Sequence, residues 1–307
     1  KNETDAILIT TSPPISSIAG IVINKFKKYP IIYWVMDINP DQIVSQKILK
    51  KNNIFVRLMN YLNKNILASS RLVITLDRFM GKTLLKKGVD KKILKIIPPW
   101  PHINSFEKID KSTNQFRIDN DWINKFVVMY SGNHTPSNPI NTIVSAAKDL
   151  SDNKDIIFVF IGEGLDKKIV NKAINDGYKN IISLGYQNKE YLKYSLSAAD
   201  LHVVTVGNDI VGICHPCKIY GAMSVGRPII LVSPSLCHAT DISYRSNFIK
   251  RANHGDVNEA KKIINSFYRL DSEPIAKLGM EAQAQIKNKY SESILCGKLI
   301  NEINNIF

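Results

Sequence analysis

Short apolar runs alternate with longer amphipathic segments along the first third of the chain. Four of these runs are too short for helices and are rich in β-branched residues, so they predict strands at 5–12, 30–37, 71–76 and 93–99. The segments between them have apolar residues at helical spacing and predict helices over about 16–28, 41–70 and 78–87. A polar stretch follows and predicts a linker.

The same alternation resumes near residue 125. Strands are predicted at 125–132, 155–164, 180–186, 201–207 and 227–233, and helices at 139–150, 165–176, 188–197 and 274–304. Short apolar strands separated by amphipathic helices are typical of parallel sheets covered on both faces. The pattern predicts an α/β protein with two doubly wound domains. Their expected bounds are 1–104, a linker over 105–124, 125–290, and a C-terminal helix over 291–307 that packs back toward the first domain.

Size and composition are those of a water-soluble protein. A chain of 307 residues suggests about two domains, at roughly 100–200 residues each. None of its apolar stretches reaches the ~18 residues that a membrane-spanning helix needs. The four cysteines have no disulfide-like spacing, which favours a reducing compartment and a cytoplasmic location.

The net charge of +14 is unevenly distributed. Residues 1–104 carry 17 Lys/Arg but 6 Asp/Glu. A basic surface attracts nucleic acid, anionic lipid or phosphorylated substrates, whereas a general bias toward Lys and Asn would explain the total but not the asymmetry. No recognisable nucleic-acid module with interleaved aromatic residues is present, so we expect no nucleic-acid partner.

The loops after the strands of the second domain are the expected location of the chemistry. Ligands of doubly wound sheets bind beyond the carboxyl ends of the strands. Nearly all of these loops are rich in glycine or proline, at 131–139, 162–164, 185–187, 207–209 and 214–218. Glycine lets a backbone approach a phosphate closely, although in any single loop it can simply end a strand. Five such loops on one edge predict a nucleotide or phosphate site, without the spacing of a dinucleotide fingerprint or a P-loop.

The stretch CHPCK (214–218) raises the alternative of a zinc site. Its ligands would come from Cys214, Cys217 and Cys237, with His215 or His238. Structural zinc usually takes two separated Cys-x-x-Cys knuckles, and the second element here is an adjacent Cys-His pair. We therefore expect no metal, and interpret 214–218 as a loop that presents backbone N–H groups and Lys218 to a diphosphate.

Several stretches of the chain have a recognisable pattern. The runs VVMYSGNHTPSNPINTIVSAAKDL, IIFVFIGEG and HPCKIYGAMSVGRPIIL resemble the donor domain of family 4 glycosyltransferases, of the type that builds bacterial surface polysaccharides. TTSPP, VMDINPDQI and VITLDRFMGKTLLKKGV resemble the second half of its acceptor domain. The resemblance implies a GT-B fold, in which two Rossmann-like domains face a cleft. The first strands of the acceptor domain have no counterpart before Lys1, so we expect an N-terminally truncated chain with an incomplete first domain.

The resemblance also implies a reaction. A sugar would pass, with retention and without a metal or other cofactor, from a UDP-linked nucleotide-diphosphate sugar to the hydroxyl of a saccharide or lipid-linked saccharide. Two features of the family are missing here: Ile213 and Gly221 stand where many members have glutamates, and Asn133 and His134 stand where an Arg and a Lys are usual. Lys218 is expected to supply the missing positive charge.

The candidate site follows from these matches. Lys218 and Asp37 are the expected catalytic residues, with Ser12 and Arg78 on the acceptor side. The donor is expected to contact Gly132, Asn133, His134, Gly162, Gly164, Tyr186, Gln187, His215, Pro216, Cys217, Ile219 and Gly221. Two alternatives stay open: Asp37 as a helix cap or turn residue before Pro40, and His134 as a cap of its own loop.

Other functions and a membrane role are also open. A non-catalytic protein that binds sugar nucleotides or polyanions would fit the missing glutamates, and a GT-B epimerase would have to use Asp37, Asp77 and His134.

Segment 41–70 combines an apolar stripe with basic residues, namely Lys47, Lys50, Lys51, Arg57 and Lys64. It predicts a peripheral contact with anionic lipid at the inner face of the cell membrane, unless the stripe packs on the domain's own sheet.

Overall fold

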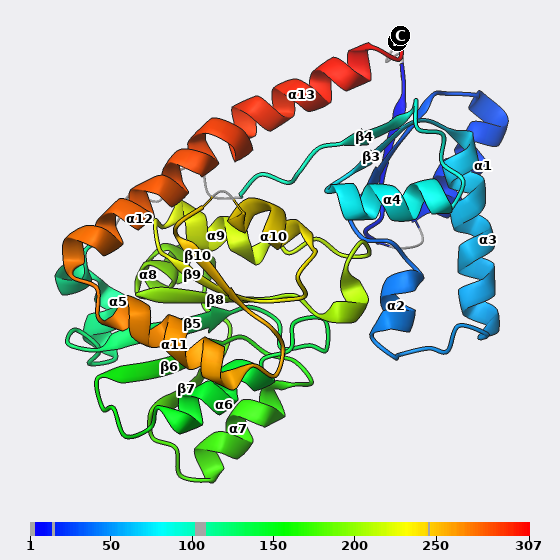
Figure 1. Ribbon diagram of the computed structural model, residues 1–307. Coiled ribbons are helices and arrows are strands. Elements are labelled where there is room, and N and C mark those ends of the chain that lie inside the picture. The colour runs from blue at the N-terminus through cyan, green and yellow to red at the C-terminus, as the bar shows by residue number, and fades with distance from the viewer. Residues whose placement is uncertain (1–3, 14–15, 102–108, 245) are drawn as a thin grey trace. The chain divides into compact units, whose positions relative to one another are not determined.

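The computed structural model describes residues 4–13, 16–101, 109–244 and 246–307 (Figure 1). The chain forms two compact units. Unit 1 comprises Lys1–Trp100, Asp209–His215 and Glu292–Phe307, and unit 2 comprises Pro101–Asn208 and Pro216–Ser291. The chain therefore passes from one unit to the other after residues 100, 208, 215 and 291. No helix in the described ranges is long and apolar enough to span a bilayer.

Unit 1 is built on a parallel sheet whose strands follow the order of the sequence. The strands are β1 (Ile7–Thr10), β2 (Ile31–Val35), β3 (Ser70–Thr75) and β4 (Leu94–Ile96). Every residue of β2 is buried, which explains its continuous apolar run. The helices of the unit are α1 (Ser16–Lys27), α2 (Asp41–Ser45), α3 (Ile54–Ser69), α4 (Arg78–Lys86) and α13 (Glu292–Asn304).

The predicted helix over 41–70 is wrong as a single element. The structure breaks it into α2 and α3, and Lys47 between them adopts a left-handed backbone conformation with φ 59°. Asn53 then begins a new helix, because its side chain accepts a hydrogen bond from the Phe55 backbone N–H at 2.8 Å. The apolar stripe of α3 is divided: Val56, Ile66 and Leu67 are buried and Met59 and Leu62 are half-buried, whereas Ile54, Phe55, Leu58 and Tyr61 are exposed.

Unit 2 contains a six-stranded parallel sheet in the order β10-β9-β8-β5-β6-β7. These strands are β5 (Phe126–Ser131), β6 (Ile156–Ile161), β7 (Ile181–Leu184), β8 (Leu201–Thr205), β9 (Ile229–Val232) and β10 (Ile249–Ala252). Alternate residues of β5 and β6 enter two apolar cores, one on each face. The α/β prediction with two parallel, Rossmann-like sheets is confirmed.

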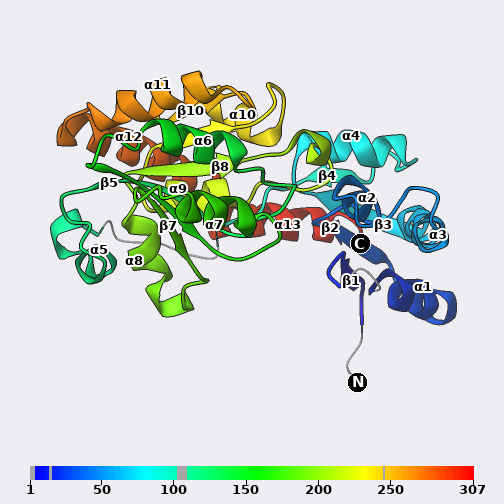
Figure 2. The ribbon, with the colours of Figure 1, turned by 90° about the horizontal axis from the view of Figure 1, so that it is seen from below.

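Helices cover both faces of the second sheet. One face packs against α6 (Asn141–Asp149), α7 (Lys167–Asn175) and α11 (Val257–Tyr268), and the other against α5 (Gln115–Asp119) and α8 (Leu192–Ser197). Figure 2 shows α6 and α11 on the side of the sheet opposite α5 and α8. The remaining helices of the unit are α9 (Lys218–Ser224), α10 (His238–Ser243) and α12 (Ser272–Gln285).

The described part of the predicted linker, residues 109–124, is a folded part of unit 2. Residues 105–108 lie outside the described residues. Phe116 and Trp122 pack edge to face, with ring centroids 5.7 Å apart, in the core below the sheet. Arg117 is fully buried and donates to the Asp200 carboxylate at 2.6 Å. The predicted helix over 274–304 is interrupted at Ser291: α12 continues as a π-helical turn over Ile286–Tyr290, and α13 starts at Glu292 in unit 1.

The direction of winding reverses beside β5. From β5 the chain adds β6 and β7 on one side, and then β8, β9 and β10 on the other. Loops that leave the carboxyl ends of β5 and β8 diverge at such a switch point and leave room for a ligand. The loop at 131–134 and the segment that leads into α9 both begin there.

Candidate active site

The loops after β5 and β6 approach each other backbone to backbone. The Gly132 N–H donates to the Ile161 carbonyl at 2.9 Å, and the His134 N–H donates to the Glu163 carbonyl at 2.9 Å. Gly162 has φ 123°, and a Cβ at that position would overlap the Gly132 carbonyl. Glycine is therefore required at 162 for both conformation and space. A side chain at Gly164 would similarly overlap the His134 carbonyl.

Lys218, the first residue of α9, extends its ammonium group over these loops. Its Nζ lies 4.1 Å from the centre of the Tyr130 ring, and it donates to the Tyr130 hydroxyl and, at 3.3 Å, to the Asn133 carbonyl. Gly132 leaves space for the lysine, because a Cβ there would overlap Lys218 Cε. Burial lowers the pKa of Lys218 to about 7.

All the partners of this ammonium group are neutral. Among the described residues, none of the Asp or Glu side chains forms an ion pair with Lys218. Desolvation of a cation costs free energy that an anionic partner offsets. A phosphate placed beside Nζ and the glycine loops would be such a partner.

Tyr130 and His134 form the floor of the same site. The Tyr130 hydroxyl donates to the Asn133 carbonyl at 2.6 Å, and burial raises the pKa of this phenol. The His134 ring is fully buried, 5.0 Å from the Tyr130 ring, and its nitrogens have no hydrogen-bond partner in the described part of the chain. Burial, aided by Lys218 and Lys167, lowers the pKa of His134 to about 4. The imidazole is therefore neutral near pH 7 and adds no charge for a phosphate.

The other predicted donor residues lie at the same edge of unit 2 or under it. The Tyr186 hydroxyl donates to Asn133 Oδ1 at 2.5 Å, and Gln187 donates to the Gly185 carbonyl at 3.0 Å. Pro216 and Cys217 precede Lys218 directly, and Cys217 is exposed. Ile219 is fully buried, and Gly221 of α9 lies against Leu196 of α8. Asn133, Tyr186 and Lys218 thus converge, whereas the Ile219 side chain is turned into the core.

The predicted acceptor-side residues follow three neighbouring strands of unit 1. Ser12, Asp37 and Arg78 come after the carboxyl ends of β1, β2 and β3. The Asp37 N–H donates to Thr11 Oγ1 at 3.1 Å, and Asp37 forms an antiparallel bridge with Cys214. Burial raises the pKa of the Asp37 carboxyl, against the opposing effects of Cys214 and His215. The N-cap of α2 is Pro40, so Asp37 does not cap that helix.

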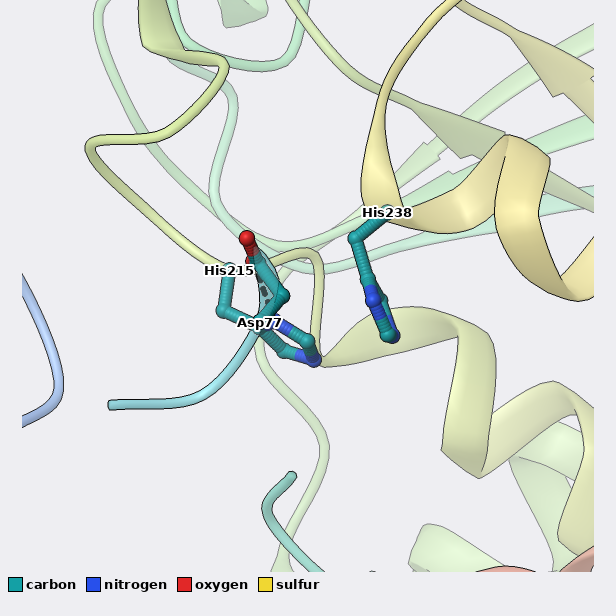
Figure 3. Close-up of side chains that lie close together, drawn as sticks. All are labelled: Asp77, His215 and His238. Atoms are coloured by element: carbon teal, nitrogen blue, oxygen red, sulfur yellow. Dashed lines mark hydrogen bonds and ion pairs between the residues drawn. The ribbon is translucent and has the colours of Figure 1, made fainter. Parts of the chain in front are cut away.

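His215, a predicted donor contact, pairs with Asp77 inside unit 1. Its Nδ1 lies 2.8 Å from Asp77 Oδ2, and both side chains are almost fully buried (Figure 3). The other Asp77 oxygen accepts the backbone N–H groups of Phe79 and Met80 at 2.8 Å and caps α4. His238, also drawn in Figure 3, belongs to unit 2, where its Nε2 lies 2.9 Å from the Tyr220 hydroxyl.

Three residues of these networks were not predicted in the roles that they have. Tyr130 binds Lys218, Thr11 holds the Asp37 backbone, and Asp77 holds His215. Tyr130 leaves a weak signal, since it is a phenol near the carboxyl end of an otherwise apolar strand. Thr11 and Asp77 leave the same kind of signal after β1 and β3, although Asp77 was considered only as an epimerase residue.

Comparisons with known proteins agree with this arrangement. The family model described as glycosyl transferases group 1 matches residues 112–285. A Pseudomonas aeruginosa protein named as glycosyltransferase WbjE is 24% identical over 291 residues, which are 94% of this chain and 72% of that protein. The Escherichia coli protein WcaI, named as a colanic acid biosynthesis glycosyl transferase, is 26% identical over 167 residues, 52% of this chain and 40% of that protein.

Solved structures show the same fold. Anabaena HepE in complex with UDP and glucose superposes with a TM-score of 0.76 at 18% identity, over 97% of this chain and 77% of that chain. At that identity the likeness shows the fold, and it confirms the GT-B architecture expected from the sequence.

Proposed function

The chain belongs to the group 1 glycosyl transferases, and we propose that it moves a sugar from a UDP-linked donor to a saccharide hydroxyl, with retention and without a metal ion. Cell-surface polysaccharide assembly is the proposed setting, supported by the name of the WcaI relative. The acceptor is a saccharide or a lipid-linked saccharide. A second candidate function is not needed, because Asp77 and His134, which an epimerase would use, are both buried inside the protein.

The observation that carries the proposal is the position of Lys218. A half-buried ammonium group with neutral partners lies over glycine loops at the switch point of a parallel sheet. Phosphates bind where backbone N–H groups and a cation converge. The missing Arg and Lys of the first donor loop are thereby replaced by a lysine from α9.

The same residues account for the proposed chemistry. Departure of the nucleoside diphosphate develops negative charge on the leaving oxygen, and a fixed cation nearby lowers the barrier. Lys218 supplies this cation, and its bonds to Tyr130 and the Asn133 carbonyl hold it in position before the donor arrives. In unit 1, Asp37 is the proposed contact for the acceptor hydroxyl, with Ser12 and Arg78 beside it.

A panel of nucleotides tests the donor proposal. We expect UDP and UDP-sugars to raise the melting temperature, and UMP to do so much less because it lacks the second phosphate that Lys218 would bind. At 100 times its Kd, a ligand stabilises the folded state by about 2.7 kcal/mol. EDTA should not change the result. Equal stabilisation by UMP and UDP would contradict a diphosphate site at Lys218.

We also propose that α3 lies against anionic lipid at the inner face of the cell membrane. Part of its apolar stripe faces outward: Ile54 is 82%, Leu58 53% and Tyr61 65% exposed. Phe55 and Leu58 line an apolar cavity of about 270 Å³ in the same unit. Exposed Lys47, Lys50, Lys51, Arg57 and Lys64 lie on α3 or just before it, and such a basic rim complements anionic headgroups.

Liposome flotation tests this surface. Binding should require anionic lipid and should fall as salt rises, because exposed charges are screened beyond about 8 Å at physiological ionic strength. Changing Lys47, Lys50 and Lys51 together to Gln should release the protein. The matched control changes the exposed Lys86, Lys91 and Lys92 to Gln, which removes the same charge elsewhere. Equal loss of binding in both variants would mean that only net charge matters, and would overturn α3 as the contact.

A further inference from the structure

Segment Asp209–His215 leaves unit 2 after β8 and becomes part of unit 1. There the Ile213 carbonyl accepts the Ile38 N–H at 2.9 Å, and Cys214 forms its bridge with Asp37. The chain then returns to unit 2 at Pro216, two residues before Lys218. Lys218, which we propose binds the diphosphate, therefore follows only three residues after the segment that pairs with Asp37.

A buried side-chain contact holds the end of this segment. His215 Nδ1 bonds to Asp77 Oδ2, and the His215 and Asp77 side chains are 1% and 2% exposed. Asp77 is itself immobilised, since its other oxygen accepts two backbone N–H groups of α4. The imidazole therefore links the backbone at 213–215 to Asp77, the N-cap residue of α4. Figure 3 shows the His215 and Asp77 side chains against each other.

We propose that His215 is a positioning residue, which acts through Nδ1 and Asp77 to hold segment 209–215 against the strand end that carries Asp37, and so keeps Asp37 in place for the acceptor. This inference rests on the proposed function of Lys218 and Asp37. It differs from the sequence-based expectation that His215 contacts the donor itself. The two roles use different ring atoms, because a donor contact would have to use Nε2.

Two amide substitutions separate the roles. The amide of Asn lies near the position of Nδ1, and the amide of Gln lies near that of Nε2. We expect His215→Asn to keep kcat within about threefold, while His215→Ala and His215→Gln lower kcat at least tenfold. The Kd for UDP should change less than threefold in all three variants, because Tyr130, Asn133 and Lys218 are untouched. Retained kcat in His215→Gln with loss in His215→Asn would overturn the proposal in favour of a donor contact.

Asp77→Asn provides the matched control for folding. Asn caps helices as well as Asp does, so α4 should remain intact and the melting temperature should change little. The partner of His215 loses its charge, so kcat should fall with UDP affinity retained. An unchanged kcat in Asp77→Asn would contradict the inferred role of the pair.

Hydrogen exchange gives a readout that does not need turnover. The Ile38 amide is protected by the Ile213 carbonyl, so its exchange should speed up at least tenfold in His215→Ala and His215→Gln but not in His215→Asn. Unchanged exchange in His215→Ala would overturn the positioning role. If the wild-type protein bound no nucleotide, the proposed function would fail, while this measurement would still decide whether His215 anchors the segment.

Discussion

Lys218→Met should weaken the binding of UDP by about 10- to 100-fold, the effect of losing a charge-assisted hydrogen bond of about 1.5–3 kcal/mol. Methionine keeps most of the apolar stem that crosses the Tyr130 ring, so the loops after β5 and β6 should stay in place. Titration calorimetry on the folded variant measures the change. Unaltered affinity would remove Lys218 from the donor site and, with it, the main support for the proposed function.

Lys172→Met is the matched control for this substitution. Lys172 lies on α7 of the same unit, is mostly exposed and pairs with Asp176 on its own helix at 3.0 Å. Its removal takes away the same charge without touching the glycine loops. We expect its Kd for UDP to match that of the wild type.

The free energy of unfolding should also depend on pH, in part because of Lys218. Its folded-state pKa of about 7 lies below the ordinary lysine value of 10.5, so the folded state binds fewer protons than the unfolded state between these values. The contribution of Lys218 to the free energy of unfolding therefore rises with pH across this window. In Lys218→Met the rise should be smaller than in the wild type. The affinity for UDP should change in the opposite direction and fall above pH 7, because the diphosphate needs the protonated amine.

The second large effect is expected at the buried pair of Arg117 in α5 and Asp200, the residue before β8. Asp200→Asn should lower the free energy of unfolding of unit 2 by about 3–5 kcal/mol, the usual cost of leaving one member of a buried ion pair without its partner. Arg117 is fully buried and donates to Asp200, and the carboxylate also accepts the Val127 N–H at 2.8 Å. Asparagine keeps the volume, so the loss would come from charge.

Urea denaturation followed by tryptophan fluorescence can measure this change, because Trp122 lies in the same core. Lys111→Met is the control. Its ammonium group reaches the other Asp200 oxygen, but its side chain is 43% exposed, so its removal should cost less than about 1 kcal/mol. Similar losses in both variants would show that Arg117 contributes no more than a surface pair.

The strands were predictable because buried parallel strands are continuous apolar runs, as β2, β5 and β6 are. The element around Arg117 was not predictable, since this buried guanidinium is compensated by Asp200, 83 residues away, and by the Ala198 carbonyl, 81 residues away. β10 was missed for a related reason: it reads IKRA, and its two basic residues lie in a strand at the edge of the sheet.

The candidate site was likewise predictable from the sequence only in part. Lys218, Asn133 and the glycine loops were identifiable because loops after parallel strands share one edge of a sheet. The partners that decide their chemistry were not. Tyr130 lies 88 residues before Lys218, and Asp77 lies 138 residues before His215, so each pairing depends on the tertiary fold. His134 was predicted as a donor contact or a cap of its own loop, and its burial, which lowers its pKa to about 4 and leaves it neutral near pH 7, was not predictable.

The order in which the units are completed during synthesis follows from the path of the chain. Unit 1 takes residues from both the early part of the chain and Glu292–Phe307, whereas unit 2 is finished at Ser291. A ribosome therefore releases the last residues of unit 2 before it releases α13. Unit 2 can therefore reach its native state first, and unit 1, which carries Asp37, is completed only when α13 has been synthesised and Glu302 can pair with Lys95.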